Sequence, residues 1–102
     1  MEIQLHTDFE PYYEKHEITG EGSLIYNQWI FRFGDKGLSV VCHTCKDMII
    51  TYGNEECPFE AVLIGFDDDG NKELIAEPSG YFTQEDINKM LHKLEEEDKC
   101  CS

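Results

Sequence analysis

The sequence predicts one α+β domain, in which a small, mainly antiparallel sheet of about four to five strands carries one C-terminal amphipathic helix packed on it. Three observations lead to this fold class. Apolar residues alternate with a period of two through the middle of the chain, glycine-containing turns separate these stretches, and a helical period replaces them near residue 83. The length of 102 residues fits a single domain, 1–102.

Residues 24–77 are predicted to form the sheet, after a less regular N-terminal segment over residues 1–23. Residues 24–33 read as a strand, because their aromatic side chains alternate onto one face. The glycines of residues 34–37 favour a turn, and residues 38–43 are predicted as the hairpin partner. The remaining expected elements are, in chain order, a short strand within 48–52, a strand at 60–66, a turn at 67–71, a strand at 72–77 and a break at 78–80.

The strand at 60–66 also predicts how the layers are arranged. Its central residues 61–64 are all apolar, so both faces of this strand should be covered. The helix can cover one face. For the other face we favour the N-terminal segment, with Phe9, Tyr12 and Tyr13, over a second copy of the chain.

The helix is the most clearly specified element, and we expect it over residues 83–98. Thr83 fits the N-cap and Asp86 the third helical position, which together give a short capping box. Phe82 and Ile87 are spaced for a hydrophobic staple across the first turn. The buried stripe is predicted from residues spaced three or four apart, namely Ile87, Met90, Leu91 and Leu94.

Charge limits the classes of partner. The chain has 22 acidic and 8 basic residues, a formal net charge of −14. Such a field repels nucleic acid and anionic membranes, so we expect neither direct nucleic-acid binding nor membrane binding. A charged partner should present a basic surface. The alternative is that the acids serve only to keep the protein soluble.

Two acidic runs are the candidate binding residues. One follows the helical stripe, where negative charge opposes the helix dipole, and the other lies in a predicted hairpin turn. The turn also resembles part of a calcium loop, but the glycine and glutamate that such a loop requires are missing. The predicted contact residues are Glu95, Glu96, Glu97, Asp98, Asp67, Asp68 and Asp69.

The cysteines raise the possibility of a metal site. Cys42 and Cys45 have the spacing of half a zinc site, and Cys57 is a candidate third ligand. No second pair with this spacing exists, so reduced thiols without a cofactor are the competing interpretation, and a redox pair is a weaker third one. The odd number of cysteines, five, and an N-terminus without a basic or apolar run suggest a reducing cytoplasm.

The sequence contains no recognisable catalytic constellation. Its histidines share no spacing, and neither a phosphate-binding loop nor a nucleophile motif is present. The clustered carboxylates fit turns and a helix end better than an acid–base pair in a pocket. We therefore expect a binding protein, monomeric or homodimeric, and not an enzyme.

Five stretches form a pattern that is shared with other proteins. They are Trp29-Ile30-Phe31-Arg32-Phe33, Asp35-Lys36-Gly37-Leu38-Ser39-Val40-Val41, Tyr52-Gly53, Phe59-Glu60-Ala61-Val62-Leu63 and Gly80-Tyr81-Phe82-Thr83-Gln84-Glu85-Asp86-Ile87. Across residues 26–95 the chain resembles small proteins encoded by bacteriophages and prophages, a group mainly of unknown function. The resemblance implies an α+β fold and a location in the host cytoplasm, and it implies no activity.

Charge and resemblance together lead to a functional expectation. Phage proteins that blunt host defences, many anti-CRISPR proteins among them, often present carboxylates to a groove meant for nucleic acid. We expect an accessory protein of this kind, acting by protein–protein binding as an inhibitor of a host nucleic-acid-binding or defence protein. The alternative is a zinc-stabilised accessory protein that uses Cys42 and Cys45.

Overall fold

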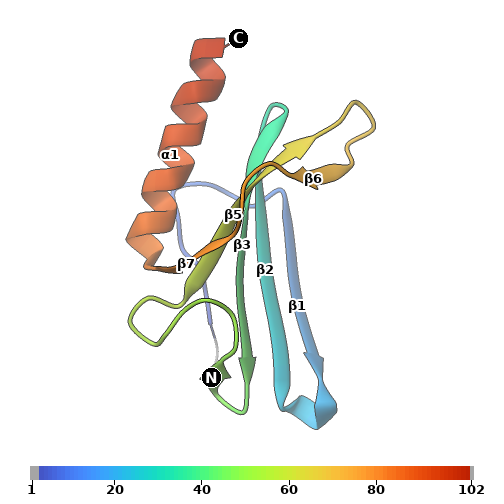
Figure 1. The fold of residues 1–102 in the computed structure, drawn as a ribbon, viewed down its shortest axis with the longest axis vertical. Helices are drawn as coiled ribbons and strands as arrows, with labels where there is room; N and C mark the ends of the chain where they lie inside the picture. Colours follow the sequence, from blue (N-terminus) through green and yellow to red (C-terminus); the bar gives the residue numbers. More distant parts are fainter. Residues whose placement is uncertain (1–2, 102) are drawn as a thin grey trace.

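The structure is a computed structural model that describes residues 3–101, with side chains as far as residue 99. It confirms the α+β class: one antiparallel sheet of seven strands carries one C-terminal helix (Figure 1). The elements in chain order are β1 (Tyr13–Thr19), a 3-10 turn η1 (Gly20–Gly22), β2 (Leu24–Phe33), β3 (Lys36–Cys45), β4 (Met48–Ile49), β5 (Phe59–Phe66), β6 (Lys72–Leu74), β7 (Ser79–Phe82) and α1 (Gln84–Cys101).

The sheet is built around β2, β3 and β5. Its strand order is β1-β2-β3-β5-β6. In addition, the short strand β4 pairs with β3, and β7 pairs with β5, as β6 also does. The expected strands at 24–33, 38–43 and 60–66 correspond to β2, β3 and β5, and the turn at 34–37 joins the first two. The strand expected at 72–77 is shorter, because pairing with β5 ends at Leu74.

Two strands were not predicted. β1 lies in the segment expected to be less regular, and its seven residues pair with β2. β7 includes part of the expected break at 78–80: Ser79 lies opposite Ala61, and Phe82 lies opposite Phe59. Gly80 makes this approach possible, since a β-carbon there would lie 2.1 Å from the β-carbon of Tyr52.

The helix begins as the sequence predicts and continues further. The Asp86 amide donates to the Thr83 hydroxyl (3.1 Å), and the Thr83 amide donates to the Asp86 carboxylate (2.9 Å), which completes a reciprocal capping box. The helix continues to Cys101, past the predicted end at residue 98. Ile87, Leu91 and Leu94 are buried against the sheet, so the predicted stripe is confirmed at these positions.

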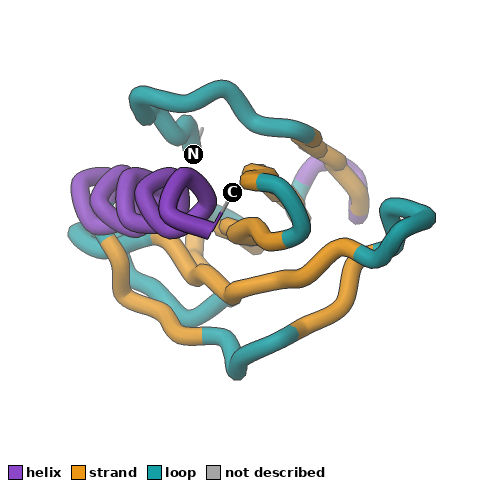
Figure 2. Tube along the Cα trace, turned by 90° about the horizontal axis from the view of Figure 1, so that it is seen from above, coloured by secondary structure: helices purple, strands orange, loops and turns teal. Residues whose placement is uncertain are grey.

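The main core lies between α1 and one face of the sheet. Its buried members are Trp29, Phe31, Leu38, Val40, Cys42, Phe59, Ala61, Ile87, Leu91 and Leu94. The N-terminal segment lies on this same side of the curved sheet, next to the helix (Figure 2). Because Phe9 packs with its ring 5.4 Å from that of Phe33, the expectation that Phe9 covers the opposite face is wrong.

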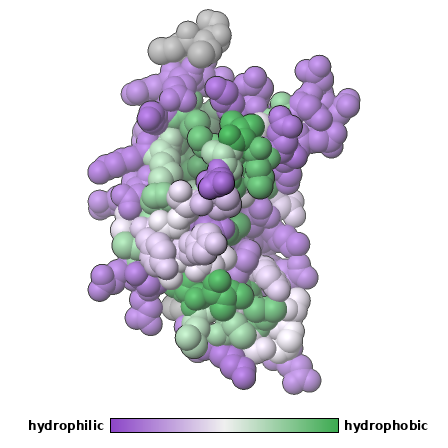
Figure 3. Space-filling view, in the orientation of Figure 1, coloured by the Kyte–Doolittle hydropathy of each residue, from purple (hydrophilic) through white to green (hydrophobic). Residues whose placement is uncertain are grey.

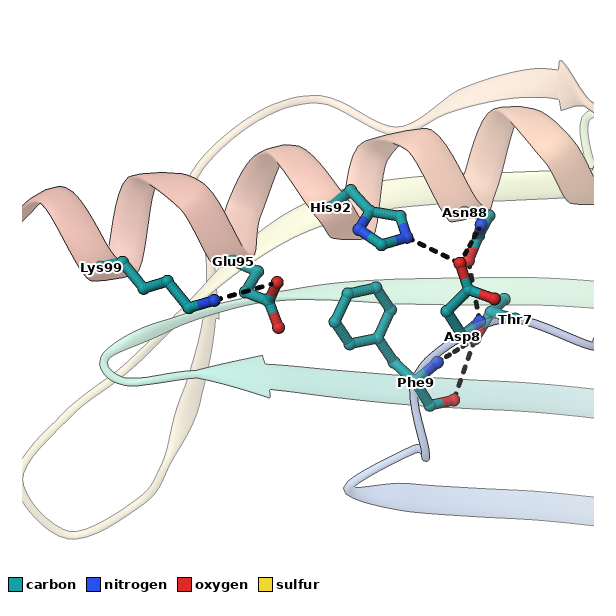
Figure 4. A network of polar contacts seen from close by, with 7 residues as sticks. All are labelled: Thr7, Asp8, Phe9, Asn88, His92, Glu95 and Lys99. Carbon is teal, nitrogen blue, oxygen red and sulfur yellow. Dashed lines mark hydrogen bonds and ion pairs between the residues drawn. The ribbon is translucent and has the colours of Figure 1, made fainter.

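A polar contact joins the N-terminal segment to the helix (Figure 4). The Asp8 carboxylate accepts hydrogen bonds from Asn88 at 3.0 Å and from His92 at 2.7 Å, and these bonds lower its pKa. The Phe9 ring stands edge-on to His92, with centroids 4.8 Å apart. One short segment therefore docks through charge and aromatic contact together.

The second face of the sheet has its own, smaller apolar cluster. Ile30, Ile64 and Phe66 form a smaller buried cluster there. The Arg32 guanidinium stacks on the Phe66 ring at 4.4 Å, and Tyr12 meets that ring at 5.7 Å. Tyr12 thus does help to cover this face, together with the β5–β6 hairpin.

The position of Leu91 gives a test of this packing. Leu91 is 0% exposed, so replacing it with alanine should lower the free energy of unfolding by about 2–5 kcal/mol. The same replacement at Leu74, which is 67% exposed, should change it by about 0.5 kcal/mol or less. Urea denaturation of both variants measures the difference, and equal losses would contradict the packing described.

Candidate functional site

The two acidic runs lie at one end of the molecule. Figure 1 shows the end of α1 at the upper left, the β5–β6 turn at the upper right and the β2–β3 turn between them. A β-carbon on Gly34 of the β2–β3 turn would lie 2.6 Å from the Asp98 carboxylate, so helix and turn are in contact. The Phe66 amide donates to the Asp35 carbonyl at 2.8 Å, which holds the third element beside the second.

We call this region the acidic end. Its carboxylates, drawn from three elements, are Asp35, Asp67, Asp68, Asp69, Glu95, Glu96, Glu97 and Asp98. The space-filling view shows strongly hydrophilic side chains projecting from both upper corners of the molecule (Figure 3). Glu95 is partly compensated, because Lys99 lies 3.4 Å from it one helical turn later. Glu96, Glu97 and Asp98 are exposed.

Asp67 differs from its neighbours because it holds its own turn together. Its carboxylate accepts hydrogen bonds from the amides of Asp69 (2.9 Å) and Asn71 (2.8 Å), and the bond from Asn71 is the main cause that lowers its pKa. This supports a turn and not a calcium loop. Asp68 and Asp69 are exposed, so they are the better contact candidates of the three.

The predicted zinc pair is not formed. Cys42 and Cys45 both lie within β3, and residues three apart in an extended strand point to opposite faces. Cys42 is buried in the main core, Cys45 is half-buried on the other face, and Cys57 lies in the loop before β5. Among the residues described, no group of three or more His, Cys, Asp or Glu side chains is arranged to hold a metal ion.

A second feature escaped the sequence analysis: a hollow of about 720 Å³ beside β1. Residues 3–6 form one wall, and strands β1 and β2 form the other. Its polar wall combines Glu14 and His16 of β1 with Asn27 and Trp29 of β2, whose indole nitrogen donates to Glu14 at 3.1 Å. Glu14 and His16 are two residues apart, a signal that becomes readable only once β1 is known to be a strand.

The hydrogen bonds of His16 define its charge. Its Nδ1 lies 2.7 Å from the Asn27 side-chain oxygen, which must accept because the Asn27 amide nitrogen donates to the Cys42 carbonyl. Its Nε2 lies 2.7 Å from the Glu14 carboxylate, which can also only accept when ionised. Both ring nitrogens donate only in the imidazolium form. The bonds to Asn27 and then Glu14 accordingly raise the pKa of His16.

His43, on β3, shows the opposite behaviour. Its Nδ1 accepts a hydrogen bond from the backbone amide of Asn27 at 3.2 Å, which requires that this ring nitrogen be unprotonated. Burial lowers the pKa of His43, although Glu60 opposes this in part. Asn27 therefore sits between a histidine that favours the charged form and one that favours the neutral form.

No family model, curated protein or solved structure matches this chain. Within residues 3–101, no helix is long and apolar enough to cross a membrane.

The two histidines should titrate in a definite order. His16 should titrate above the ordinary value of 6.5, and His43 below it. The stability that His16 adds is present below pH 6.5 and is lost as the pH rises through its raised pKa, whereas the contribution of His43 is lost as the pH falls through its lowered pKa. Proton NMR titration, with His16→Gln and His43→Gln for assignment, measures both. The reverse order would contradict the hydrogen bonds described.

The thiols should differ in reactivity. Cys42 is 0% exposed and burial raises its pKa to about 11, so a thiol reagent should modify it only after unfolding. Cys42→Ser should leave the number of thiols modified in the native protein unchanged, while Cys45→Ser should reduce it by one. Rapid native modification of Cys42 would show that β3 opens far more readily than its packing suggests.

Proposed function

We propose that the chain is a non-enzymatic protein-binding module whose acidic end occupies a basic surface of another protein. The observation that carries this proposal is that the two acidic runs, which are separate in the sequence, lie at the same end of the molecule on either side of the β2–β3 turn.

The chemistry of the acidic end indicates the class of partner. Clustered carboxylates on a fixed scaffold resemble the charge of a nucleic-acid backbone, and a basic groove that receives them releases its bound counterions. Because β2, β3, β5 and α1 hold the backbone of these residues, little ordering of the backbone is needed on binding. The partner we propose is a host protein that binds nucleic acid, which the chain would inhibit by occupying that groove.

The resemblance to phage-encoded proteins supplies the biological setting of the proposal. In that setting, the partner would be a nucleic-acid-handling or defence protein of the bacterial host, and the activity would resemble that of anti-CRISPR inhibitors. The chain would act in the host cytoplasm.

Two variants of equal charge test the role of the acidic end. The first carries Glu96→Gln, Glu97→Gln and Asp98→Asn, and the control carries Glu21→Gln, Glu55→Gln and Glu56→Gln at exposed sites outside the acidic end. Each immobilised protein is exposed to bacterial lysate at low salt and eluted in salt steps. The first variant should lose capture of DNA-binding proteins and the control should keep it.

Competition gives a second readout in the same experiment. Added duplex DNA should release the captured protein, because both occupy the same groove, and the affinity should fall steeply with salt concentration. Equal losses in the two variants would mean that net charge alone matters. Capture that is insensitive to salt and to DNA would contradict the proposed mode of binding.

A further inference from the structure

The edge of the sheet at β1 has no part in the function proposed for the acidic end. β1 is seven residues long, stands at the end of the strand order, and all but Thr19 among its residues are exposed. At the opposite side of the sheet, the short strands β6 and β7 together cover β5. Long unpaired edges invite pairing with another strand unless something blocks them.

The hydrogen-bonding pattern of β2 and β3 determines which backbone groups of β1 point toward solvent. The amide and carbonyl of His43 bond to residues 50–51, away from β2, so its partner Tyr26 is in a non-hydrogen-bonded pair. Hydrogen-bonded and non-hydrogen-bonded pairs alternate along a strand, so the backbone groups of Asn27 point toward β3. They therefore cannot bond to His16, which lies opposite Asn27 on β1. The backbone of His16 therefore faces the free edge.

The same alternation fixes the rest of the strand. Glu14, His16 and Ile18 present their amides and carbonyls to solvent, while the residues between them bond to β2. The Ile30 carbonyl accepts a hydrogen bond from the Tyr12 amide, just before β1, at 2.7 Å, so it points toward β1 as the alternation along β2 requires. The edge thus offers a regular row of donors and acceptors.

We propose that β1 pairs antiparallel with β1 of a second copy, about a two-fold axis at His16. In this register, each of the three outward-facing residues exchanges two main-chain hydrogen bonds with its opposite. Lys15 of one copy lies opposite Glu17 of the other, and the reverse pair forms across the axis. These are non-hydrogen-bonded positions, where opposite side chains approach most closely.

Charge selects this register over its neighbours. An axis moved by one residue toward the start of β1 would place Lys15 opposite Lys15, and one moved the other way would place Glu17 opposite Glu17. Only the axis at His16 uses all of β1 and matches opposite charges. Lys15 and Glu17 already lie 3.0 Å apart within one chain, so both side chains are on the same face of the sheet.

The central histidines do not oppose this pairing. Each His16 is bonded to its own Glu14 and Asn27, so its charge is compensated within its own copy. Because the two strands run in opposite directions, the two acidic ends would lie at opposite poles and remain free. The inference therefore stands independently of the proposed function.

Charge swaps at the edge test this pairing. Sedimentation equilibrium at about 0.15 M salt, where the Debye length is about 8 Å, should show the wild type associating to a dimer as its concentration rises. Lys15→Glu and Glu17→Lys should each weaken self-association about tenfold or more, since each places like charges opposite each other twice. An equal mixture of the two variants should form a mixed dimer, and the double swap should restore self-association.

A backbone variant serves as a second test. Ile18→Pro removes an outward amide without removing a bond to β2, so it should abolish association while the monomer stays folded by circular dichroism. Ile18→Val is the matched control and should still associate. A wild type that is monomeric at every concentration, or a dimer that persists in Ile18→Pro and in both single charge variants, would overturn the proposal.

Discussion

The contact between the apolar stripe of α1 and the β2–β3–β5 face is the constraint on which the rest of the structure depends. Ile87 and Leu91 are fully buried there, opposite Val40 and Phe31, which are equally inaccessible. Burial of apolar surface contributes roughly 25 cal/mol per Å², so this interface stabilises the sheet and the helix together. Without it, the sheet would expose one apolar face to water.

The direction of the helix determines where charge accumulates. Because α1 lies along the strands, its last turns must reach the level of the β2–β3 and β5–β6 turns. The stretch from Glu95 to Asp98 is unfavourable for the helix dipole, yet the helix continues through it to Cys101. The unfavourable interaction with the helix dipole costs about a few tenths of a kcal/mol per charge. Burial of Leu94, one residue before this stretch, helps to offset that cost.

Elements that local signals specify could be predicted from the sequence, whereas strand pairings between distant segments could not. Thr83, Asp86 and the stripe specify the helix within a few residues, and the turn glycines mark the hairpins. β1 was missed because its residues are polar on both faces, so no alternation shows. β7 depends on the contact of Gly80 with Tyr52, which lies in the loop between β4 and β5, and no periodicity in the sequence reveals this contact.

The candidate site divides in the same way. The acidic runs could be chosen as candidate binding residues from the sequence, but their position at one end of the molecule depends on the topology of the sheet. Cys42 and Cys45 were misjudged because a spacing of two intervening residues brings thiols together in a turn, whereas an extended strand sends them to opposite faces. The bond from His16 to Asn27 spans 11 residues and needs the β1–β2 register to be known.

The clasp between Asp8 and the helix has a consequence for how the chain is made. It joins positions 80 and 84 residues apart, so it can form only after Asn88 and His92 have been synthesised. Until then Trp29, Phe31 and Val40 have no helix to cover them, although their strands are already complete. A nascent chain in that state presents a bare apolar sheet, which is the form that ribosome-bound chaperones shield from aggregation.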